Sequence, residues 1–316
     1  MALLALRDLS VSIGKLTPLD GISLEVSKGE ILGVVGESGS GKSLTATAIM
    51  GLLGRVRGTV ARGAIVFDGQ DLVGLAEPAY RRLRGKRIAL ISQNPMTSLD
   101  PIVTVGAQID QVSRLHLDLS RRAATARSIE LMNQLRIPES ETLHKAYPHQ
   151  LSGGMKQRIV IAMALAADAD LIIADEPTTA LDVTIQAQII QLMVDLVRTR
   201  NLALILITHD MGVIAQACDR VVVLYAGRVA ETNSTEAIFA APRHPYTRNL
   251  IGCIPARDQA PGTLLGIPGT VPGVLSYPCG CRFHPRCDVA VAQCAQEAPV
   301  LKTAGCGLVA CHLAEA

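Results

Sequence analysis

The sequence predicts an α/β protein with a mostly parallel sheet, an antiparallel β region at the N-terminus and a helical insertion. Three observations predict this class. Strand-like and helix-like segments alternate after residue 170, a glycine-rich loop follows a short apolar segment at 31–35, and residues from about 100 to 165 are mostly helix-like. Strands that alternate with helices require right-handed crossovers, which place parallel strands side by side beneath helices.

The N-terminal region predicts strands with one buried face. Apolar and polar residues alternate from about residue 2 to 26, and the segment Ile31–Val35 is apolar throughout, as expected of a strand buried on both faces. The alternating apolar positions are Leu4, Leu6, Leu9, Val11, Ile22, Leu24 and Val26.

The second half of the chain predicts regular alternation of strands and helices. Helix-like periodicity in the Arg- and Ala-rich stretch 120–137 belongs to the preceding helical insertion, about 100–165. The elements expected after it are a strand at Leu171–Ala174, a helix at Thr184–Val197, a strand at Ala203–Ile207, a helix at Met211–Ala217 and a strand at Val221–Tyr225.

Composition narrows the classes of function and suggests two domains. The 316 residues carry 30 Lys and Arg against 28 Asp and Glu, a balance that does not favour nucleic acid as a partner. No apolar run reaches the roughly 18 residues of a membrane span, and Arg7 and Asp8 interrupt any signal peptide, so we expect a cytosolic protein. A shift to Pro, Gly and Cys predicts a boundary between a domain at 1–240 and an extension at 241–316.

The glycine-rich loop GESGSGKS, residues 36–43, has the spacing of a phosphate-binding loop. Glycines let the backbone amides point inward, and the start of the next helix adds partial positive charge. A simple turn is the alternative, but it would leave Lys42 at a helix N-terminus without an anion. Lys42 is expected to reach the β- and γ-phosphates and Ser43 to bind Mg²⁺. The predicted nucleotide contacts here are Gly36, Glu37, Ser38, Gly39, Ser40, Gly41, Lys42, Ser43 and Leu44.

Two carboxylates end the apolar segment DLIIADE, residues 170–176. Ligands collect at the carboxyl ends of parallel strands, so Asp175 is expected in the Mg²⁺ shell and Glu176 as the residue that polarises water. A solvated turn before Pro177 is the alternative, and it would be preferred if the phosphate loop were missing. His209 also follows a strand, and we expect it to contact the γ-phosphate and the attacking water.

The segment LSGGM at 151–155, together with the phosphate loop and IIADEP, resembles the ABC ATPase family over roughly residues 4–240. The resemblance implies a P-loop NTPase fold with a RecA-like core, and it implies that Gln93 helps to bind Mg²⁺ and that TTALD at 178–182 is the D-loop. Ser152, Gly153 and Gly154 supply a hydroxyl and amides suited to a phosphate. In the family this phosphate belongs to ATP held by a second subunit, so two chains close around two nucleotides.

Three further segments resemble the ATPase subunits of dipeptide/oligopeptide and nickel importers. They are SQNPMTSLDP at 92–101, RHPYTRNLI at 243–251 and GIPGTVPG at 266–273. The resemblance implies an ATPase that powers peptide import from the cytoplasmic face of the membrane, with nickel import as the alternative and a non-transport ABC ATPase as a less favoured one. The implied partners are a second ATPase subunit in a heterodimer, two transmembrane permease subunits and an extracellular substrate-binding protein.

Six of the eight cysteines crowd the last 38 positions, where metal ligation is favoured over disulfides in a reducing compartment. Four of them, Cys281, Cys287, Cys294 and Cys311, follow the spacing C-x5-C-x6-C-x16-C, and four thiolates can hold Zn²⁺ or an iron–sulfur cluster. The family resemblance favours a structural [4Fe–4S] cluster over zinc. The remaining possible ligands are Cys279, Cys306, His284 and His312.

One position departs from the family pattern. The family usually stacks adenine on an aromatic residue of the first hairpin, and the matching position in this chain is Ile13. The chain has only three Phe, five Tyr and no Trp to replace it. Because apolar contact replaces stacking only in part, we expect weak selectivity for the base.

Overall fold

The computed structural model describes residues 2–179, 181–254 and 266–314, which form two compact units. The first unit contains Met1–Ser27, Ile31–Val73 and Leu206–Ala316. The second contains Lys28–Glu30 and Gly74–Ile205. The residues after 240 thus cluster with the N-terminal strands, and a domain boundary at 240 stays a prediction.

An antiparallel sheet forms the N-terminal part of the first unit, as the alternating pattern predicts. Its strands β1 (Leu4–Ile13), β2 (Leu16–Val26), β4 (Gly58–Phe67) and β5 (Gln70–Asp71) lie in the order β2-β1-β4-β5. All seven of the alternating apolar side chains are at most 7% exposed. Their burial stabilises this sheet, because removing apolar surface from water is the main favourable contribution to the free energy of folding.

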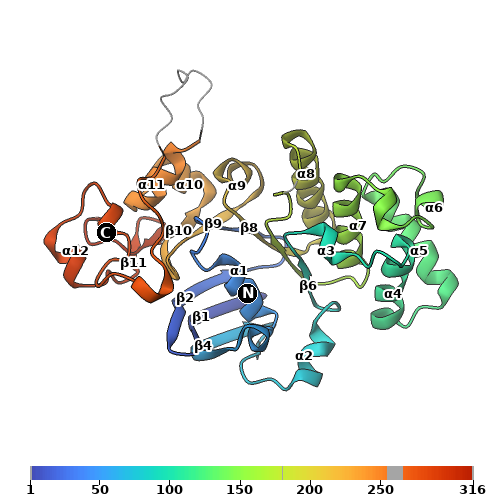
Figure 1. Ribbon diagram of the computed structural model, residues 1–316, viewed down its shortest axis with the longest axis horizontal. Coiled ribbons are helices and arrows are strands. Elements are labelled where there is room, and N and C mark those ends of the chain that lie inside the picture. Colours follow the sequence, from blue (N-terminus) through green and yellow to red (C-terminus); the bar gives the residue numbers. More distant parts are fainter. Residues whose placement is uncertain (1, 180, 255–265, 315–316) are drawn as a thin grey trace. The chain divides into compact units, whose positions relative to one another are not determined.

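A second set of strands in the first unit carries the phosphate loop (Figure 1). The strand β3 (Ile31–Val35) pairs in parallel with β9 (Arg220–Tyr225), and β10 (Arg228–Ser234) pairs antiparallel with β9. The short strands β11 (Lys302–Ala304) and β12 (Gly307–Val309) complete the order β11-β12-β10-β9-β3. Residues near the C-terminus therefore extend the sheet instead of forming a detached tail.

Short helices complete the first unit. The helix α1 follows the phosphate loop, and α10 and α11 pack against β10. They are α1 (Lys42–Ile49), η1 (Leu53–Val56), α9 (Met211–Ala217), α10 (Thr235–Ala240), α11 (Pro245–Gly252), η3 (Val274–Ser276), η4 (His284–Arg286) and α12 (Ala292–Gln296).

The second unit contains its own parallel strands. The strand β6 (Ile88–Ile91) pairs with β7 (Leu171–Asp175), and the N–H of Ala203, at the start of β8 (Ala203–Thr208), donates to the carbonyl of Asp170. The helix α8 (Val183–Arg200) connects β7 to β8. Every strand and helix expected after residue 170 is present, with ends shifted by three residues at most.

The helical insertion is confirmed in the second unit, where Figure 1 shows α4, α5, α6 and α7 grouped in green. A partly buried polar cluster links its helices: Asp110 accepts hydrogen bonds from Thr125 and Ser128 and lies 3.1 Å from the ring of His144. Besides α8, the helices of the unit are α2 (Glu77–Leu83), α3 (Pro95–Ser98), α4 (Val105–Leu117), α5 (Arg121–Gln134), α6 (Ser140–Leu143), η2 (Pro148–Gln150) and α7 (Gly153–Leu165).

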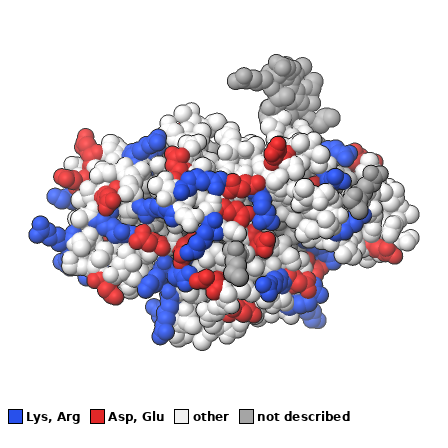
Figure 2. Space-filling model, turned by 180° about the vertical axis from the view of Figure 1, so that it is seen from behind, with Lys and Arg blue, Asp and Glu red and all other residues white. Residues whose placement is uncertain are grey.

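The surface agrees with the balanced composition. On the face shown in Figure 2, basic and acidic side chains are interspersed. Within the described ranges, 2–179, 181–254 and 266–314, no helix combines the length and the apolar character that crossing a bilayer requires.

Candidate nucleotide site

The phosphate loop follows β3 directly and ends at Ser43, the second residue of α1, so it lies between a strand and a helix as the sequence predicts. At two positions of the loop, steric contacts explain why the residue is glycine. A Cβ atom on Gly36 would lie 2.2 Å from the carbonyl oxygen of Leu224, and one on Gly41, which has φ of 104°, would lie 2.5 Å from Cδ2 of Leu19. Only glycine lets the loop turn this closely against β9 and β2.

Lys42 is the central cation of the loop. Its side chain is 5% exposed, and its Nζ donates hydrogen bonds to the carbonyl oxygens of Gly36 (2.7 Å) and Glu37 (3.0 Å). These carbonyls hold the ammonium group across the loop. The first turn of α1 has no acidic residue, so the helix N-terminus and Lys42 together favour an anion.

Other loop residues leave polar groups for a ligand. Ser38, Gly39 and Ser43 are exposed. The Ser40 hydroxyl is fully buried and has no hydrogen-bond partner among the described residues, which costs about 1–3 kcal/mol. These features fit a loop whose polar groups are satisfied by phosphate.

Glu37 is bound from the far end of the chain. Its carboxylate accepts two hydrogen bonds from Arg286, at 2.7 and 3.0 Å, and its backbone N–H donates to the hydroxyl of Tyr246 at 2.9 Å. Sequence reasoning missed Arg286 altogether and used the segment around Tyr246 only as a family marker. The one available signal was an isolated arginine beside Cys287.

The second unit brings Gln93 and Glu176 together. Gln93 follows β6 and Glu176 follows β7, and because these parallel strands pair in register, both residues emerge at the same edge. Gln93 Nε2 donates to Glu176 Oε2 at 2.9 Å, and Thr179 Oγ1 donates to the same oxygen at 3.0 Å. The carboxylate is thus oriented by two donors.

The backbone of Glu176 is also unusual. Its φ is 47°, in the left-handed region that non-glycine residues rarely adopt. Such strain concentrates at functional positions, where the surrounding structure holds it. Asp175, the last residue of β7, is half-buried beside it. Of the predicted D-loop, Thr178, Thr179, Leu181 and Asp182 are described, whereas Ala180 lies outside the described residues.

The segment LSGGM forms an exposed helix N-terminus. Ser152 caps α7, its Oγ accepting from the Met155 N–H at 3.3 Å, and both Ser152 and Gly153 are exposed. A Cβ on Gly154 would lie 2.8 Å from Ile185 Cγ2, so glycine permits close packing on α8. A capped N-terminus of a 13-residue helix offers amides and partial charge to an anion.

The predicted residues are divided between the two units. The phosphate loop and the exposed His209 belong to the first, and Gln93, Ser152, Asp175 and Glu176 belong to the second. Their assembly into one site stays a prediction.

The four cysteines predicted as metal ligands line one small cavity in the first unit, together with His284 and His312. Burial is the main cause that raises the pKa of the Cys281 and Cys287 thiols, and the other cysteines of the cavity add to it. The exposed Cys279 and Cys306 do not line the cavity. The ring nitrogens Nδ1 of His284 and Nε2 of His312 lie 2.9 Å from the carbonyl oxygens of Cys281 and Glu297.

The cavity does not have the arrangement of a single-ion site. Among residues 2–179, 181–254 and 266–314, no three or more His, Cys, Asp or Glu side chains are grouped to hold one metal ion. A zinc site would need its sulfurs at about 2.3 Å from a common centre.

Comparison with known proteins matches two regions of the chain to known families. Residues 19–179 match the family described as ABC transporter, and residues 230–294 match the family described as oligopeptide/dipeptide transporter, C-terminal region. The dipeptide transport ATP-binding protein DppD of Escherichia coli is 48% identical over 305 residues, 95% of this chain and 93% of that protein. The oligopeptide transport ATP-binding protein AppD of Bacillus subtilis is 45% identical over 298 residues, covering 94% and 91%.

Solved structures with the same fold include a dimer with bound nucleotide. A dimeric post-hydrolysis state of the ATP-binding cassette MJ0796, bound to ADP and phosphate, superposes with a TM-score of 0.65 at 26% identity, over 73% of this chain and 98% of that one. The structure of cbiO1 from Clostridium perfringens, part of the ABC transporter complex cbiONQ, has a TM-score of 0.68 at 25% identity, over 76% and 91%.

Proposed function

The chain belongs to the ABC transporter ATP-binding family, and from this premise we propose that it is the ATP-hydrolysing subunit that powers import of dipeptides or oligopeptides. One observation carries the proposal: a single chain matches both the ABC ATPase region and the C-terminal region of oligopeptide/dipeptide transporters. Relatives named for dipeptide and oligopeptide transport align over more than nine-tenths of the chain.

The proposed reaction is hydrolysis of ATP bound with Mg²⁺, in which the terminal phosphoryl group is transferred to water. Lys42 and the loop amides would hold the phosphates, and Ser43, Gln93 and Asp175 would hold the metal ion. Glu176, oriented by Gln93 and Thr179, would polarise the attacking water, and His209 would contact the γ-phosphate. The buried Ser40 hydroxyl and the exposed loop tip support this assignment.

A second ATPase chain completes the site in this proposal. The exposed N-terminus of α7, with Ser152, Gly153 and Gly154, would bind the nucleotide held by the phosphate loop of the partner. The family resemblance favours a different partner chain over a second copy. Two transmembrane permeases, at whose cytoplasmic face the ATPases would work, and an extracellular substrate-binding protein would complete the importer.

The experiment that tests the function is transport itself. The chain, co-expressed with the second ATPase and the permeases of its operon and placed in vesicles, should drive ATP-dependent uptake of a labelled dipeptide or oligopeptide. Uptake of labelled nickel without peptide uptake would support the alternative importer instead. ATPase activity without uptake of either solute would contradict the assignment to this class of importer.

The cysteine cavity is proposed to hold a structural [4Fe–4S] cluster, bound by Cys281, Cys287, Cys294 and Cys311. The support is that these four thiols line one cavity while Cys279 and Cys306 do not. Because burial raises the pKa of Cys281 and Cys287, their thiolates need a positive centre to offset desolvation, and a cluster supplies it.

Protein purified without oxygen should show a broad absorbance band around 400 nm, as expected of thiolate-bound iron and sulfide. The matched variants are Cys287→Ser, which should lose the band, and Cys306→Ser, which should keep it. Colourless protein with one equivalent of zinc would refute the cluster and support zinc.

Replacement of the family's aromatic residue by Ile13 should weaken base selectivity. Aromatic stacking is worth about 0.5–1.5 kcal/mol, so kcat/KM for ATP and for GTP should agree within roughly tenfold. The variant Ile13→Tyr should bind both nucleotides more tightly. Steady-state kinetics with the two nucleotides measures the ratio, and a hundredfold preference of the unchanged protein for ATP would contradict the prediction.

A further inference from the structure

We infer that the C-terminal region positions the phosphate loop by holding Glu37, so that Arg286 and Tyr246 are positioning residues of the nucleotide site. The inference rests on the proposed function of the loop, and it adds residues that lie outside the ABC ATPase motifs. All of the contacts that support it are within the first unit.

The first contact is a bidentate ion pair between Arg286 and Glu37. Arg286 NH1 lies 2.7 Å from Glu37 Oε2, and NH2 lies 3.0 Å from Oε1. The Arg286 side chain is only 6% exposed, and that of Glu37 is 29% exposed. A bidentate pair with this burial orients both groups, unlike an exposed ion pair, which contributes little.

Arg286 is itself held in place by groups other than Glu37. Its Nε donates to the carbonyl oxygen of Pro268 at 2.7 Å, and its NH1 donates to the hydroxyl of Tyr225 at 3.3 Å. Its NH2 also donates to the carbonyls of Ile267 and Gly269, both at 3.4 Å. The guanidinium therefore links the loop to the backbone of residues 267–269 and to the side chain of Tyr225.

The second contact fixes the backbone of Glu37. Its N–H donates to the Tyr246 hydroxyl at 2.9 Å, and Tyr246 is fully buried, with its ring 4.6 Å from that of Tyr225 and 5.3 Å from that of Phe283. The N–H of Tyr246 donates to His244 Nδ1 at 3.0 Å. Burial lowers the pKa of His244 to about 4, so this nitrogen remains an acceptor at neutral pH.

Each polar group of Glu37 thus has a partner. The N–H is bound by Tyr246, the carboxylate by Arg286, and the carbonyl oxygen by Lys42 at 3.0 Å and by the Ser40 N–H at 3.2 Å. A loop held in one conformation binds its ligand more tightly, because less freedom is lost on binding. Arg286 also neutralises a carboxylate that would otherwise repel the triphosphate.

The test is nucleotide affinity of the purified full chain, measured by calorimetry with MgATP and MgADP. Arg286→Gln should weaken binding roughly tenfold or more, because it removes two charge-assisted hydrogen bonds and leaves Glu37 uncompensated. The double variant Glu37→Gln/Arg286→Gln should recover part of the loss, since the repulsive charge is gone. Tyr246→Phe should weaken binding with the charges unchanged.

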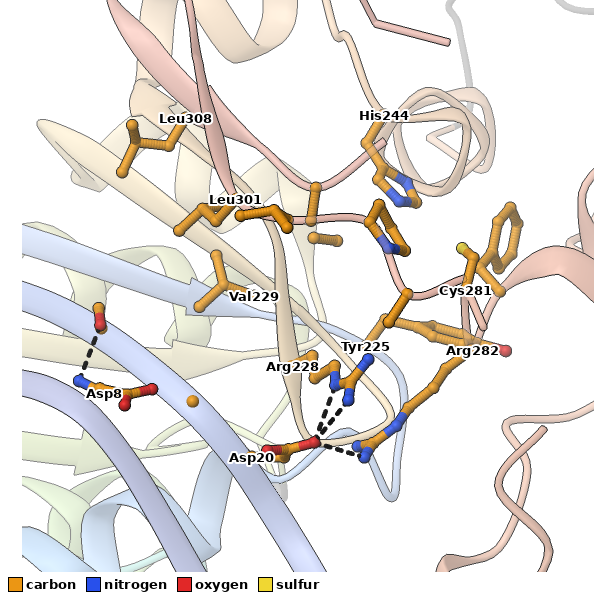
Figure 3. A pocket seen from close by; sticks show the side chains of 18 of the residues that line it. Asp8, Asp20, Tyr225, Arg228, Val229, His244, Cys281, Arg282, Leu301 and Leu308 are labelled. Carbon is orange, nitrogen blue, oxygen red and sulfur yellow. Dashed lines mark hydrogen bonds and ion pairs between the residues drawn. The ribbon is translucent and has the colours of Figure 1, made fainter. Parts of the chain in front are cut away.

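Arg282→Gln is the matched control. Arg282 lies four residues away, is 11% exposed and donates to Asp20 at 3.0 Å instead of to the loop, as Figure 3 shows. It lines a separate cavity of about 600 Å³ with Arg228, which binds the same carboxylate. The control should lower the melting temperature measured by circular dichroism without changing the affinity for nucleotide.

Two results would overturn the inference: wild-type affinity in folded Arg286→Gln, or an equal loss of affinity in folded Arg282→Gln. The first would show that the ion pair does not position the loop, and the second that any damage to the C-terminal region has the same effect. Failure of the unchanged protein to bind MgATP would instead contradict the proposed function.

Discussion

Replacing Glu176 by glutamine should leave MgATP binding unchanged and lower the rate of hydrolysis by about two to four orders of magnitude. Glutamine keeps the shape of the side chain and can still meet Gln93 and Thr179, which hold the carboxylate in the structure. It cannot accept a proton from water. Nucleotide affinity and phosphate release, measured on the same preparation, separate the two effects.

The same variant should also accumulate as a closed dimer with MgATP, because hydrolysis is what lets the two chains separate in the proposed cycle. Size-exclusion chromatography in MgATP detects it when the second ATPase subunit is present. Asp195→Asn, on the exposed face of α8 in the same unit, is the matched control and should retain full turnover. Normal turnover of the Glu176 variant would exclude Glu176 as the base.

Replacing Lys42 by alanine should remove nucleotide binding itself, raising the Kd for MgATP by about a hundredfold or more. Its ammonium group is buried and held across the loop by two carbonyl oxygens, so it meets the phosphates without reorganisation. Calorimetric titration with MgATP measures the loss, and hydrolysis should fall with it.

Lys86→Ala supplies the matched control for this second variant, because Lys86 is exposed in the turn before β6, away from the phosphate loop in sequence. It should bind MgATP as the unchanged protein does. If Lys42→Ala bound MgATP with unchanged affinity, the role of the loop as the phosphate site would be wrong. A loss of secondary structure in the variant is checked by circular dichroism before titration.

Most of the regular structure was predictable because its signals are local. The apolar segment Ile31–Val35 became a fully buried strand, and the alternating residues of β1 and β2 became the buried face of an antiparallel sheet. These patterns report the burial that each segment requires, which is a property of its own residues.

The strands β4, β5, β6, β10, β11 and β12 were not predicted. The last two have three residues each, too few to show a period. The pairing of β12 with β10 places Leu308 opposite Thr232, so the stability of β12 depends on a strand far away in the chain. A short strand next to an unknown neighbour has no signature of its own.

Some residues of the site were predictable from the sequence and others were not, as with the strands. Glycine spacing identified the phosphate loop, a strand end identified Glu176, and only the family resemblance supplied Gln93, which the structure places against Glu176. The four cysteines with the predicted spacing line one cavity, but metal ligation by them stays a prediction. Neither pattern indicated that Arg286 binds the Glu37 carboxylate. In sequence, a single arginine in a Pro- and Cys-rich segment cannot be told from a solvent-exposed arginine.

The sequence alone determined the chemistry of this protein: a loop that binds phosphates, a carboxylate at a strand end and a helix start that suits an anion. Only the tertiary structure decided which distant residues bind these parts of the site. Arg286, for example, forms an ion pair with Glu37, which lies 249 positions away in the chain. The physical reason is that motif chemistry depends on neighbouring residues and backbone conformation, whereas an ion pair between distant residues exists only after folding has brought both backbones to one place.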